Sequence, residues 1–391
     1  MKIVFWIALF IVFYTYIGYG ILLYIIIRLK RLFVGRPHEA VLPADGELPT
    51  MTLMICAYNE EDIVKEKMAN TLALDYPKDK FRIMWVTDGS NDHTNELLAA
   101  YPEVDIVFSP ERRGKTAALK HGLRELKTRY VAFTDANTMI NTGALREIAR
   151  LFSDPTVGCV SGEKRVAARK AGEMASEGEG LYWRYESTLK RWDSELYSAM
   201  GAAGELYAID PQLCREVPDE ALLDDFMLSM YVVQAGKRIA YTSDAYAREY
   251  GSANIYEESK RKRRIAAGGL QSIWWLRSML NPLRQPLVTF QYVSHRVLRW
   301  SITPVAMVLL LIVNIALVAM GAGTFYTVML ILQTLFYLMA LAGWLTNRFG
   351  YKNKLLYTAY YFVFMNFNVF RGMAYLRSHG KSGAWEKAKR S

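Results

Sequence analysis

Long apolar stretches lie near both ends of this chain. Residues 3 to 27 are almost uninterrupted apolar sequence, and residues 302 to 320 and 324 to 345 are apolar on either side of Gly321-Ala322-Gly323. A helix of about 20 apolar residues is long enough to cross a bilayer. The pattern therefore predicts an N-terminal membrane helix and a helical hairpin near the C-terminus.

A further segment near the C-terminus is ambiguous. Residues 355 to 376 are aromatic and apolar, but they include Asn366, Asn368 and Arg371. The basic tail after them favours a cytoplasmic C-terminus, whereas four alternating spans that start outside would place it outside. The segment either spans the membrane or lies in its interface, and the sequence leaves both open.

The middle of the chain alternates short apolar runs with helix-like stretches. Runs of buried-strand type cover residues 51–56, 82–86 and 130–133, and stretches with a helical pattern cover residues 63–74 and 116–126. Strands that alternate with helices favour a parallel sheet covered on both faces. We therefore expect an α/β domain with a mostly parallel sheet.

The segments between these regions have their own character. Residues 37 to 49 contain Pro37, Pro43 and Pro49 and are typical of a linker. After the α/β domain, a basic run at 260–264 begins a stretch in which Ala266 and Ile273 share one helical face. That stretch is interpreted as amphipathic helices at the membrane surface, with a solvated basic helix as the alternative. The predicted divisions are a membrane helix at 1–30, a linker at 31–49, the α/β domain at 50–250, interfacial helices at 251–300, a membrane hairpin at 301–345, and a third membrane or interfacial segment with the basic tail at 346–391.

Charge refines this topology. The formal net charge is +10, the mean hydropathy is +0.04, and hydrophobic residues make up 52% of the chain. Only Lys2 precedes the first apolar stretch, whereas basic residues follow it and precede the hairpin (Arg28, Lys30, Arg31 and Arg36; Arg296 and Arg299). This placement favours an uncleaved anchor in the cell membrane with the α/β domain in the cytoplasm, and it favours a lipid bilayer over nucleic acid as the partner. The three cysteines are widely spaced, which is typical of thiols in a reducing compartment.

Carboxylates follow the predicted strands. Asp88 comes after the second strand and Asp135 after the third, and the pair Asp224-Asp225 precedes a predicted helix at Phe226. Ligand sites of α/β folds lie at the carboxyl ends of strands. Asp135 and Asn137 offer oxygen ligands to Mg²⁺ or Mn²⁺, and mutual repulsion raises one pKa of an aspartate pair, which suits a general base. Turn and helix-cap roles are the simpler alternative for each cluster.

Other motifs complete a candidate site. Tyr58 and Glu60, after the first strand, could hold a base and a ribose. Lys115 opens a helix after a glycine and could bind an anion. The small residues from Gly201 to Gly204, with Glu205, would let a sugar approach the backbone closely. Helix starts and ligand-free loops are the alternatives.

In this order, the motifs resemble those of the membrane-bound family 2 glycosyltransferases, which include cellulose, chitin, hyaluronan and poly-N-acetylglucosamine synthases. The resemblance implies a GT-A fold in which Tyr58, Glu60 and Asp88 contact the nucleoside. It also implies that Lys115 and Arg264 bind the diphosphate. Asp135 would bind the metal, the strand from Gly201 would form the acceptor site with Asp224 beside it, and Asp225 would be the catalytic base.

Two positions depart from the family pattern. Asn137 replaces the second metal aspartate, and Arg261-Lys262-Arg263-Arg264-Ile265 stands where the family has Gln-x-x-Arg-Trp. The stacking tryptophan is therefore lost, and Trp183, Trp274 or Trp275 are candidates to hold a sugar instead. Weaker processivity follows as an expectation.

The function implied is a metal-dependent, inverting transfer from a nucleotide-sugar donor to a growing exopolysaccharide or capsule chain. An export partner or a homo-oligomer would complete the path for the polymer. One alternative is the transfer of a single sugar to a lipid-linked acceptor. Another is a membrane-anchored binding or scaffold protein with an inactive transferase domain.

Overall fold

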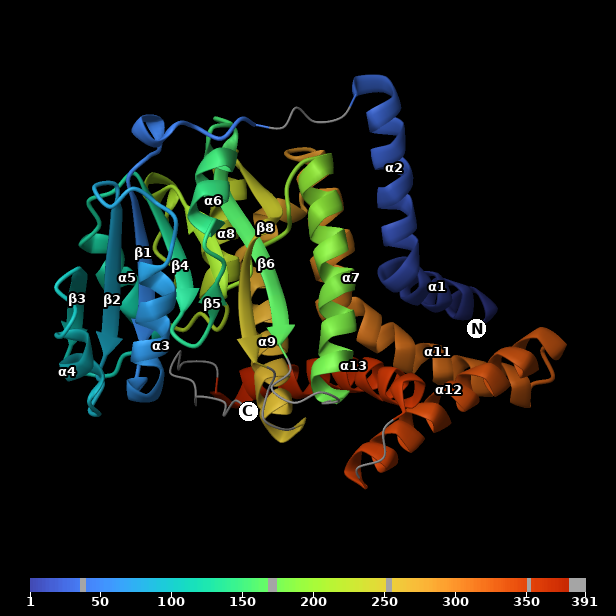
Figure 1. The fold of residues 1–391 in the computed structure, drawn as a ribbon. Helices are drawn as coiled ribbons and strands as arrows, with labels where there is room; N and C mark the ends of the chain where they lie inside the picture. Colours follow the sequence, from blue (N-terminus) through green and yellow to red (C-terminus); the bar gives the residue numbers. More distant parts are fainter. Residues whose placement is uncertain (36–39, 168–173, 251–254, 350–352, 380–391) are drawn as a thin grey trace.

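The computed structural model describes residues 1–35, 40–167, 174–250, 255–349 and 353–379. Arg36, Pro37 and the basic tail at 380–391, all used in the topology prediction, lie outside the described residues. Within these residues a sheet and its covering helices form one half of the molecule, and long apolar helices extend from the other half (Figure 1).

An eight-stranded sheet has the order β3-β2-β1-β4-β7-β6-β8-β5. The strands β1 to β4 pair in parallel, as predicted, whereas β7 runs antiparallel to both β4 and β6, and β5 antiparallel to β8. The sheet is thus mixed, with its parallel half formed by the first four strands. The strands are β1 Met51–Ala57, β2 Phe81–Asp88, β3 Val104–Ser109, β4 Tyr130–Asp135, β5 Met139–Ile140, β6 Val157–Ala167, β7 Leu206–Ile209 and β8 Arg238–Tyr250.

Helices cover both faces of this sheet, as the alternating pattern predicts. Alternate residues of a strand point to opposite faces. Accordingly, Leu53 and Ile55 of β1 belong to one hydrophobic core with α3, α4 and α6, and Met54 belongs to a second core with α5 and α8. These helices are α3 Glu61–Leu72, α4 Thr94–Leu98, α5 Lys115–Arg124, α6 Ala144–Phe152 and α8 Asp224–Gln234, and short 3₁₀ turns lie at Asp45–Glu47, Pro211–Leu213 and Arg277–Leu280.

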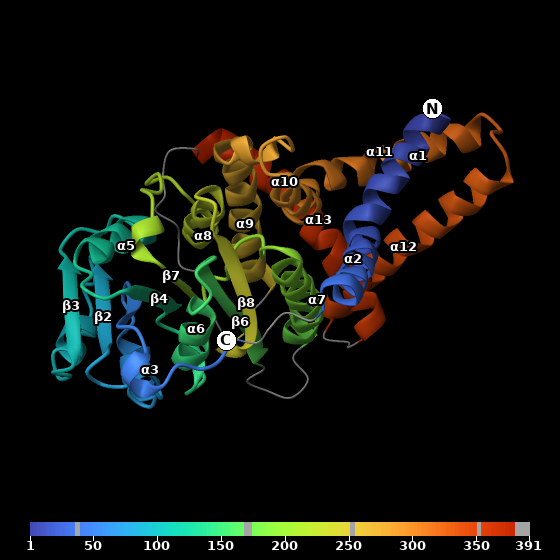
Figure 2. The ribbon, with the colours of Figure 1, turned by 90° about the horizontal axis from the view of Figure 1, so that it is seen from above.

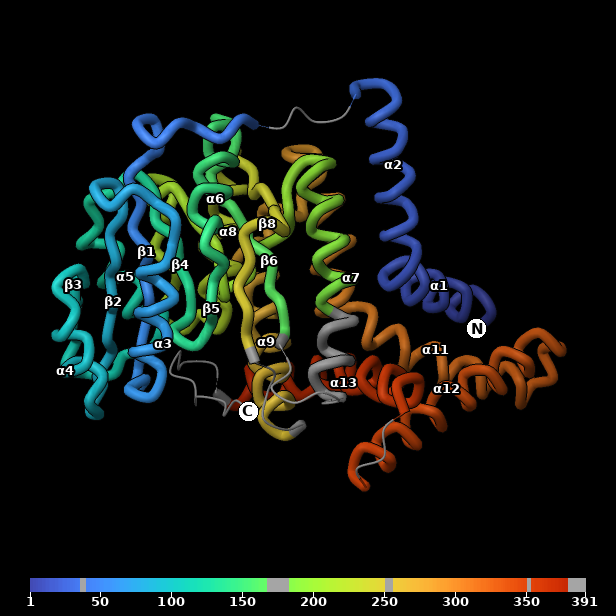
Figure 3. Tube along the Cα trace, in the orientation of Figure 1, coloured from blue at the N-terminus to red at the C-terminus, as the bar shows by residue number. Residues whose placement is uncertain are grey.

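The N-terminal helix bends and joins the two halves of the molecule. It consists of α1 Lys2–Phe13, the π-helical turn η1 Tyr14–Gly18 and α2 Tyr19–Val34. Tyr19, Leu23 and Ile27 of α2 pack on Leu189 of α7 Met174–Leu196. In the tube of Figure 3, α7 stands between the sheet and α2, while α1 turns away toward α11.

The basic residues after the first apolar stretch hold this helix to α7. Lys30 Nζ donates to the carbonyl oxygens of Glu195 and Leu196 at 2.6 and 2.9 Å, and Arg31 makes two 2.6 Å hydrogen bonds to the Glu195 carboxylate. A cation at the end of a helix also interacts favourably with its dipole. These charges therefore face the α/β domain as well as any lipid surface.

Three helices in the described residues are long and apolar enough to cross a membrane: Lys2–Val34, Pro286–Ala319 and Thr324–Arg348. The second combines α10 Pro286–Tyr292, the π-helix η5 Val293–Ile302 and α11 Thr303–Ala319, so the predicted division at residue 300 falls inside a continuous helix. The hairpin is completed by α12 Thr324–Arg348. Large apolar side chains such as Ile312 and Ile331 are exposed on these helices, which is typical of a lipid-facing surface.

The ambiguous C-terminal segment forms α13 Lys354–His379, which is not one of those three candidate spans in the described residues. It runs beside α9 Ile255–Trp275 and α12. Its polar residues have partners: Tyr16 donates to Asn366 Oδ1 at 2.5 Å, and Arg371 donates to Ser259 Oγ. Seen from above in Figure 2, α13 passes behind α9, and it contacts both α9 and α7.

Candidate active site

The carboxyl ends of three parallel strands bring the predicted acidic clusters to one edge of the sheet. Cys56 of β1 is in register with Val86 of β2 on one side and with Asp135 of β4 on the other. The loops that contain Tyr58, Asp88 and Asp135 therefore leave the sheet side by side. This is the position predicted for a ligand site.

Hydrogen bonds fasten the first two loops to each other. The Asn59 N–H donates to Ser90 Oγ at 3.1 Å, the Glu60 N–H donates to Thr94 Oγ1 at 2.9 Å, and Asn59 bonds Asn91 through its side chain. The guanidinium of Arg112 lies 3.9 Å from the centre of the Tyr58 ring. Tyr58 and Glu60 are therefore held at the edge expected for a nucleoside.

Asp88 shapes the loop that leads into α5. Its carboxylate accepts hydrogen bonds from the backbone of Arg113 at 2.9 Å and of Gly114 at 2.6 Å. Gly89 has φ +68°, and a Cβ atom there would lie 2.5 Å from the Arg112 nitrogen. Only glycine fits this close approach. Asp88 thus positions the start of α5, and its predicted contact with a nucleoside stays a prediction.

Lys115, the first residue of α5, lies among carboxylates. Its Nζ is 2.6 Å from Asp135 Oδ1. Burial lowers the pKa of Lys115, but Asp135, Asp224 and Asp225 together outweigh burial and raise it above the ordinary value. The lysine is therefore a fixed positive charge at the predicted diphosphate position.

The predicted metal ligands supply few donors. Among the described residues, no group of three or more His, Cys, Asp or Glu side chains could hold a metal ion by itself. Asp135 and Asn137 offer one carboxylate and one amide oxygen, and Asn137 lies in the turn directly after β4. Such a set fits Mg²⁺ or Mn²⁺ shared with a phosphate group, since Mg²⁺ usually binds through one or two carboxylates plus substrate phosphates.

Asp225 has the properties of a general base. It lies in the first turn of α8, and its Oδ1 accepts the Phe226 N–H at 2.8 Å. Burial and the neighbouring Asp224 raise the pKa of Asp225 to about 6, although Lys115 acts against them. A Cβ atom on Gly204 would lie 2.7 Å from Asp225 Oδ2, so the glycine leaves room for this carboxylate.

Glu205, predicted to bind the acceptor, is held by cations of the protein. Its carboxylate accepts from Lys164 at 2.5 Å and from Arg261 at 3.2 Å, and its pKa lies well below the ordinary value because these charges outweigh the effect of burial. Arg261 occupies the position of the family's glutamine. With arginine at this position, α9 forms an ion pair with Glu205, the residue directly before β7.

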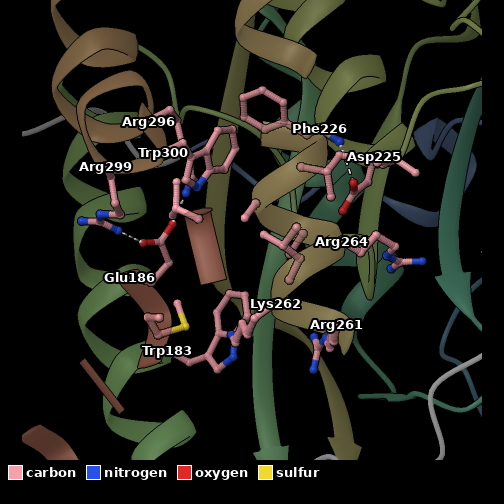
Figure 4. A pocket seen from close by; sticks show the side chains of 18 of the residues that line it. Trp183, Glu186, Asp225, Phe226, Arg261, Lys262, Arg264, Arg296, Arg299 and Trp300 are labelled. Carbon is pink, nitrogen blue, oxygen red and sulfur yellow. Dashed lines mark hydrogen bonds and ion pairs between the residues drawn. The ribbon is translucent and has the colours of Figure 1, made fainter. Parts of the chain in front are cut away.

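These residues border one cavity of about 470 Å³. Asp225 and Arg264 lie on one side of it, Glu186, Arg296 and Arg299 lie on the other, and Trp300 stands between them (Figure 4). Of the predicted site residues, the cavity brings together Lys115, Asp135, Gly204, Glu205, Asp224, Asp225 and Arg264. Tyr58, Glu60, Asp88, Asn137 and Gly201 do not border it.

Comparisons with known proteins identify the family of the central domain. Residues 52–209 match the family described as glycosyl transferase family 2, a range that includes the strands β1, β4 and β7. The chain carries a family 2 glycosyltransferase domain.

Similar proteins differ in what their names say they make. Poly-beta-1,6-N-acetyl-D-glucosamine synthase of Staphylococcus aureus is 36% identical over 124 residues, which cover 31% of this chain and 30% of that relative. Beta-monoglucosyldiacylglycerol synthase of a Synechocystis species is 25% identical over 62% of this chain and 53% of that protein. The chain thus matches about a third to a half of the length of these curated relatives.

A solved structure shares the arrangement of the whole chain. The mannosyltransferase PcManGT from Pyrobaculum calidifontis, in complex with GDP-Man and Mn²⁺, has a TM-score of 0.68 and 21% identity, with 95% of this chain and 98% of that chain covered. This similarity shows the fold. The glycosyltransferase domain is therefore of GT-A type, as predicted.

One wall of the cavity was not predicted from the sequence. Trp300 lies 4.9 Å from Phe226 between ring centres, and it borders the cavity together with Trp183. Trp274 and Trp275 do not border it, and Trp274 is largely exposed. Trp183 thus stays a candidate to stack a sugar, and Trp300 joins it.

The same wall contains buried charges. Arg296 and Arg299, interpreted from the sequence as lipid-surface cations, instead pair with Glu186 of α7 at 2.7 and 2.8 Å. His295 bonds Asp193 at 2.5 Å. Charged residues inside an apolar helix are a signal of function that the sequence does contain. The positions of Glu186 and Asp193 on one face of α7 could have pointed to their partners.

Proposed function

We propose that this protein transfers a sugar from a nucleotide-sugar donor to an acceptor hydroxyl presented at a membrane. The observation that carries the proposal is Asp225, a carboxylate with a raised pKa that borders the same cavity as Lys115 and Arg264. A base with a pKa near the working pH is efficient in proton transfer. Cations next to it suit the charge that grows on a leaving diphosphate.

Each group has a defined task in this reaction. Asp225 takes the proton of the acceptor hydroxyl while the oxygen forms a bond to the anomeric carbon of the donor. The bond between that carbon and the diphosphate oxygen breaks on the opposite face, so the configuration is inverted and the nucleoside diphosphate leaves. A divalent cation held by Asp135 and Asn137 would offset charge on the diphosphate when bound.

Arg264 is well placed to bind the diphosphate. It borders the cavity, and its Nε is buried with no hydrogen-bond partner among the described residues. A buried donor that lacks a partner costs free energy, which a bound anion would recover. A guanidinium also binds phosphate oxygens bidentately. Lys115 would approach the same group from α5.

The cavity supports a lipid-linked acceptor ahead of a free polymer. Its wall includes Tyr16 of the N-terminal candidate span and Arg296 of the second, and α13 adds Phe362 and Met365. An acceptor anchored in the bilayer could reach Asp225 along this wall. A growing polysaccharide is the second candidate, favoured by the similarity to a poly-N-acetylglucosamine synthase. In either case the catalytic domain would lie at the cytoplasmic face of the cell membrane.

A panel of nucleotide sugars, offered to the purified full chain with and without Mn²⁺, tests the proposal. We expect turnover of a particular donor, with faster release of nucleoside diphosphate when Mn²⁺ and membrane lipid are present. Product size with excess donor then separates the two acceptors: a single added sugar on lipid supports the first, and long chains support the second. No donor hydrolysis or transfer under any condition would contradict the proposal and favour a scaffold protein.

A further inference from the structure

The helix α7 carries three charged residues on the face toward η5, and two of them, Glu186 and Lys190, border the cavity. Glu186, Lys190 and Asp193 are spaced by four and three residues, so they share one helical face. All three are buried. The two carboxylates have partners on η5, since Glu186 pairs with Arg296 and Arg299, and Asp193 pairs with His295 and also accepts from Tyr19.

Lys190 differs from its neighbours. It is only 4% exposed and borders the cavity, and the described residues give its Nζ neither an ion pair nor a hydrogen bond. Burial, followed by the charge of Arg296, lowers the pKa of Lys190 to about 8, although Glu186, Glu205 and Asp225 act in the opposite direction. A desolvated ammonium without a partner is unfavourable in a folded protein unless something binds it.

The position of Lys190 fits a ligand that extends along the cavity. Its charge interacts both with Asp225, on the sugar-transfer side, and with Glu186 and Arg296, on the membrane side. The lining of the same cavity also includes apolar and aromatic side chains, among them Phe362, Met365 and Val369 of α13. The cavity thus combines a candidate base, cations and an apolar surface.

We propose that Lys190, with Arg296 beside it, binds a phosphate group of the acceptor, and that this acceptor is a lipid whose phosphate links its apolar chain to the hydroxyl-bearing part. The inference rests on the proposed transfer reaction and names the class of its acceptor. A lipid with a phosphate at that position combines a hydroxyl, an anion and an apolar chain, one for each kind of group in the lining. An uncharged glycolipid would leave the ammonium without a partner.

The test compares two ligands that differ only in the phosphate. Farnesyl phosphate and farnesol are titrated against the full chain in lipid nanodiscs, and inorganic phosphate is titrated separately. Charge-assisted hydrogen bonds typically contribute enough to change affinity about tenfold or more, so we expect farnesyl phosphate to bind at least tenfold more tightly than farnesol. Inorganic phosphate that binds as tightly as farnesyl phosphate would show a simple anion site and would overturn the lipid assignment.

Variants of Lys190 sharpen the test. In Lys190→Met the preference for farnesyl phosphate should largely disappear, whereas Lys190→Arg should keep it. Lys237→Met is the matched control, because Lys237 bonds the Pro155 carbonyl oxygen at 2.8 Å and does not border the cavity. An unchanged preference in Lys190→Met would overturn the proposal.

A stability measurement separates ligand binding from a structural role. Because Lys190 is buried without a partner, Lys190→Met should leave the melting temperature of the ligand-free protein unchanged or raise it. A large fall would show that the ammonium supports the Glu186 and Asp225 carboxylates, and would contradict the proposal. Donor hydrolysis by the unmodified protein is measured in parallel: phosphate-dependent lipid binding without any donor turnover would refute the transfer reaction and leave the lipid site standing.

Discussion

The sheet edge proposed to bind the donor and the membrane-side wall of the cavity are built in different ways. At the sheet edge, side-chain oxygens hold the backbone of the loops: Asp88 accepts two backbone N–H groups, and the N–H groups of Asn59 and Glu60 donate to hydroxyl groups of the next loop. At the membrane-side wall, side chains from separate helices hold one another, as Arg296 and Glu186 do. The first region is fixed by hydrogen bonds between neighbouring loops, whose partners are 25 to 34 residues apart in the chain, and the second by charges as far apart as 113 residues.

This contrast predicts which substitutions each region tolerates. Backbone-held loops tolerate changes at exposed side chains but not at residues that need a special backbone conformation. Paired buried charges fail when one partner is removed, because the other then stays buried and uncompensated. Mutations can therefore test the two regions separately.

The largest effect is expected for Asp225→Asn, which removes the base between the two regions. A general base typically contributes about 10²–10⁴-fold, and kcat should fall by about that factor while donor affinity is retained. Steady-state kinetics and donor titration measure the two quantities. Asp219→Asn is the matched control, since Asp219 is exposed and pairs with Lys120 outside the cavity. Near-normal turnover of Asp225→Asn would exclude the assigned role.

Arg264→Lys should weaken the interaction with the donor diphosphate and leave the membrane-side wall unchanged. Loss of bidentate binding to the diphosphate would lower kcat/KM by about 10- to 100-fold, the range for hydrogen bonds between charged groups. Arg263→Lys, one position away and outside the cavity lining, should change kcat/KM little. Equal effects of the two substitutions would show that Arg264 has no special contact with the donor.

Gly89→Ala tests the backbone-held loop. The positive φ of Gly89 and the 2.5 Å approach of the Arg112 nitrogen to a Cβ atom should cost about 1–2 kcal/mol in the free energy of unfolding. The donor KM should rise as well, because the loop before α5 must shift. Gly46→Ala, where nothing lies within 4 Å of a Cβ atom, serves as the control. A stable variant with unchanged KM would show that this loop does not shape the donor site.

The pH profile is the smallest expected change. Because the pKa of Asp225 is raised to about 6, the base is ionised above that pH, and kcat/KM should fall as the pH drops below it. Asp224 is the second cause of the raised pKa, so Asp224→Asn should move this acidic limb to lower pH. The pH dependence of kcat/KM for the two proteins provides the measurement. A limb that does not move, or that moves upward, would contradict the coupling of the pair.

The sheet edge with Asp88 and Asp135 could be predicted from the sequence, whereas the membrane-side wall of the cavity could not, and the reason is physical. Asp88, Lys115 and Asp135 each follow a strand or open a helix, so a pattern along a few residues predicts their common edge. The sheet and the helices on both of its faces were predicted in the same way, and β1, β2 and β4 lie where the apolar runs indicated. The reversed direction of β7 is a long-range property that no local pattern contains.

The membrane-side wall escaped prediction because its residues are distant in sequence. Glu186 and Arg299 are 113 residues apart, and their pairing depends on how α7 packs against η5. Arg296 and Arg299 were interpreted as lipid-surface cations because they are close in sequence to an apolar stretch. Nearness in sequence does not show which side chains they contact in the folded protein. Lys190 had no motif around it, and only its burial without a partner draws attention to it.

The bend in the N-terminal helix has a consequence for substrate choice. Its first part, α1, packs with α11 and α12, and its second part is fastened along α7 by Tyr19, Lys30 and Arg31. The 16 residues of α2 rise by roughly 24 Å at the usual helical spacing. A helix fixed at both ends would keep the Asp225 carboxylate at a constant height above the lipid. The protein would then select acceptors by their length. A hydroxyl at the right distance from the bilayer would reach Asp225, whereas the same group on a shorter or longer stem would not.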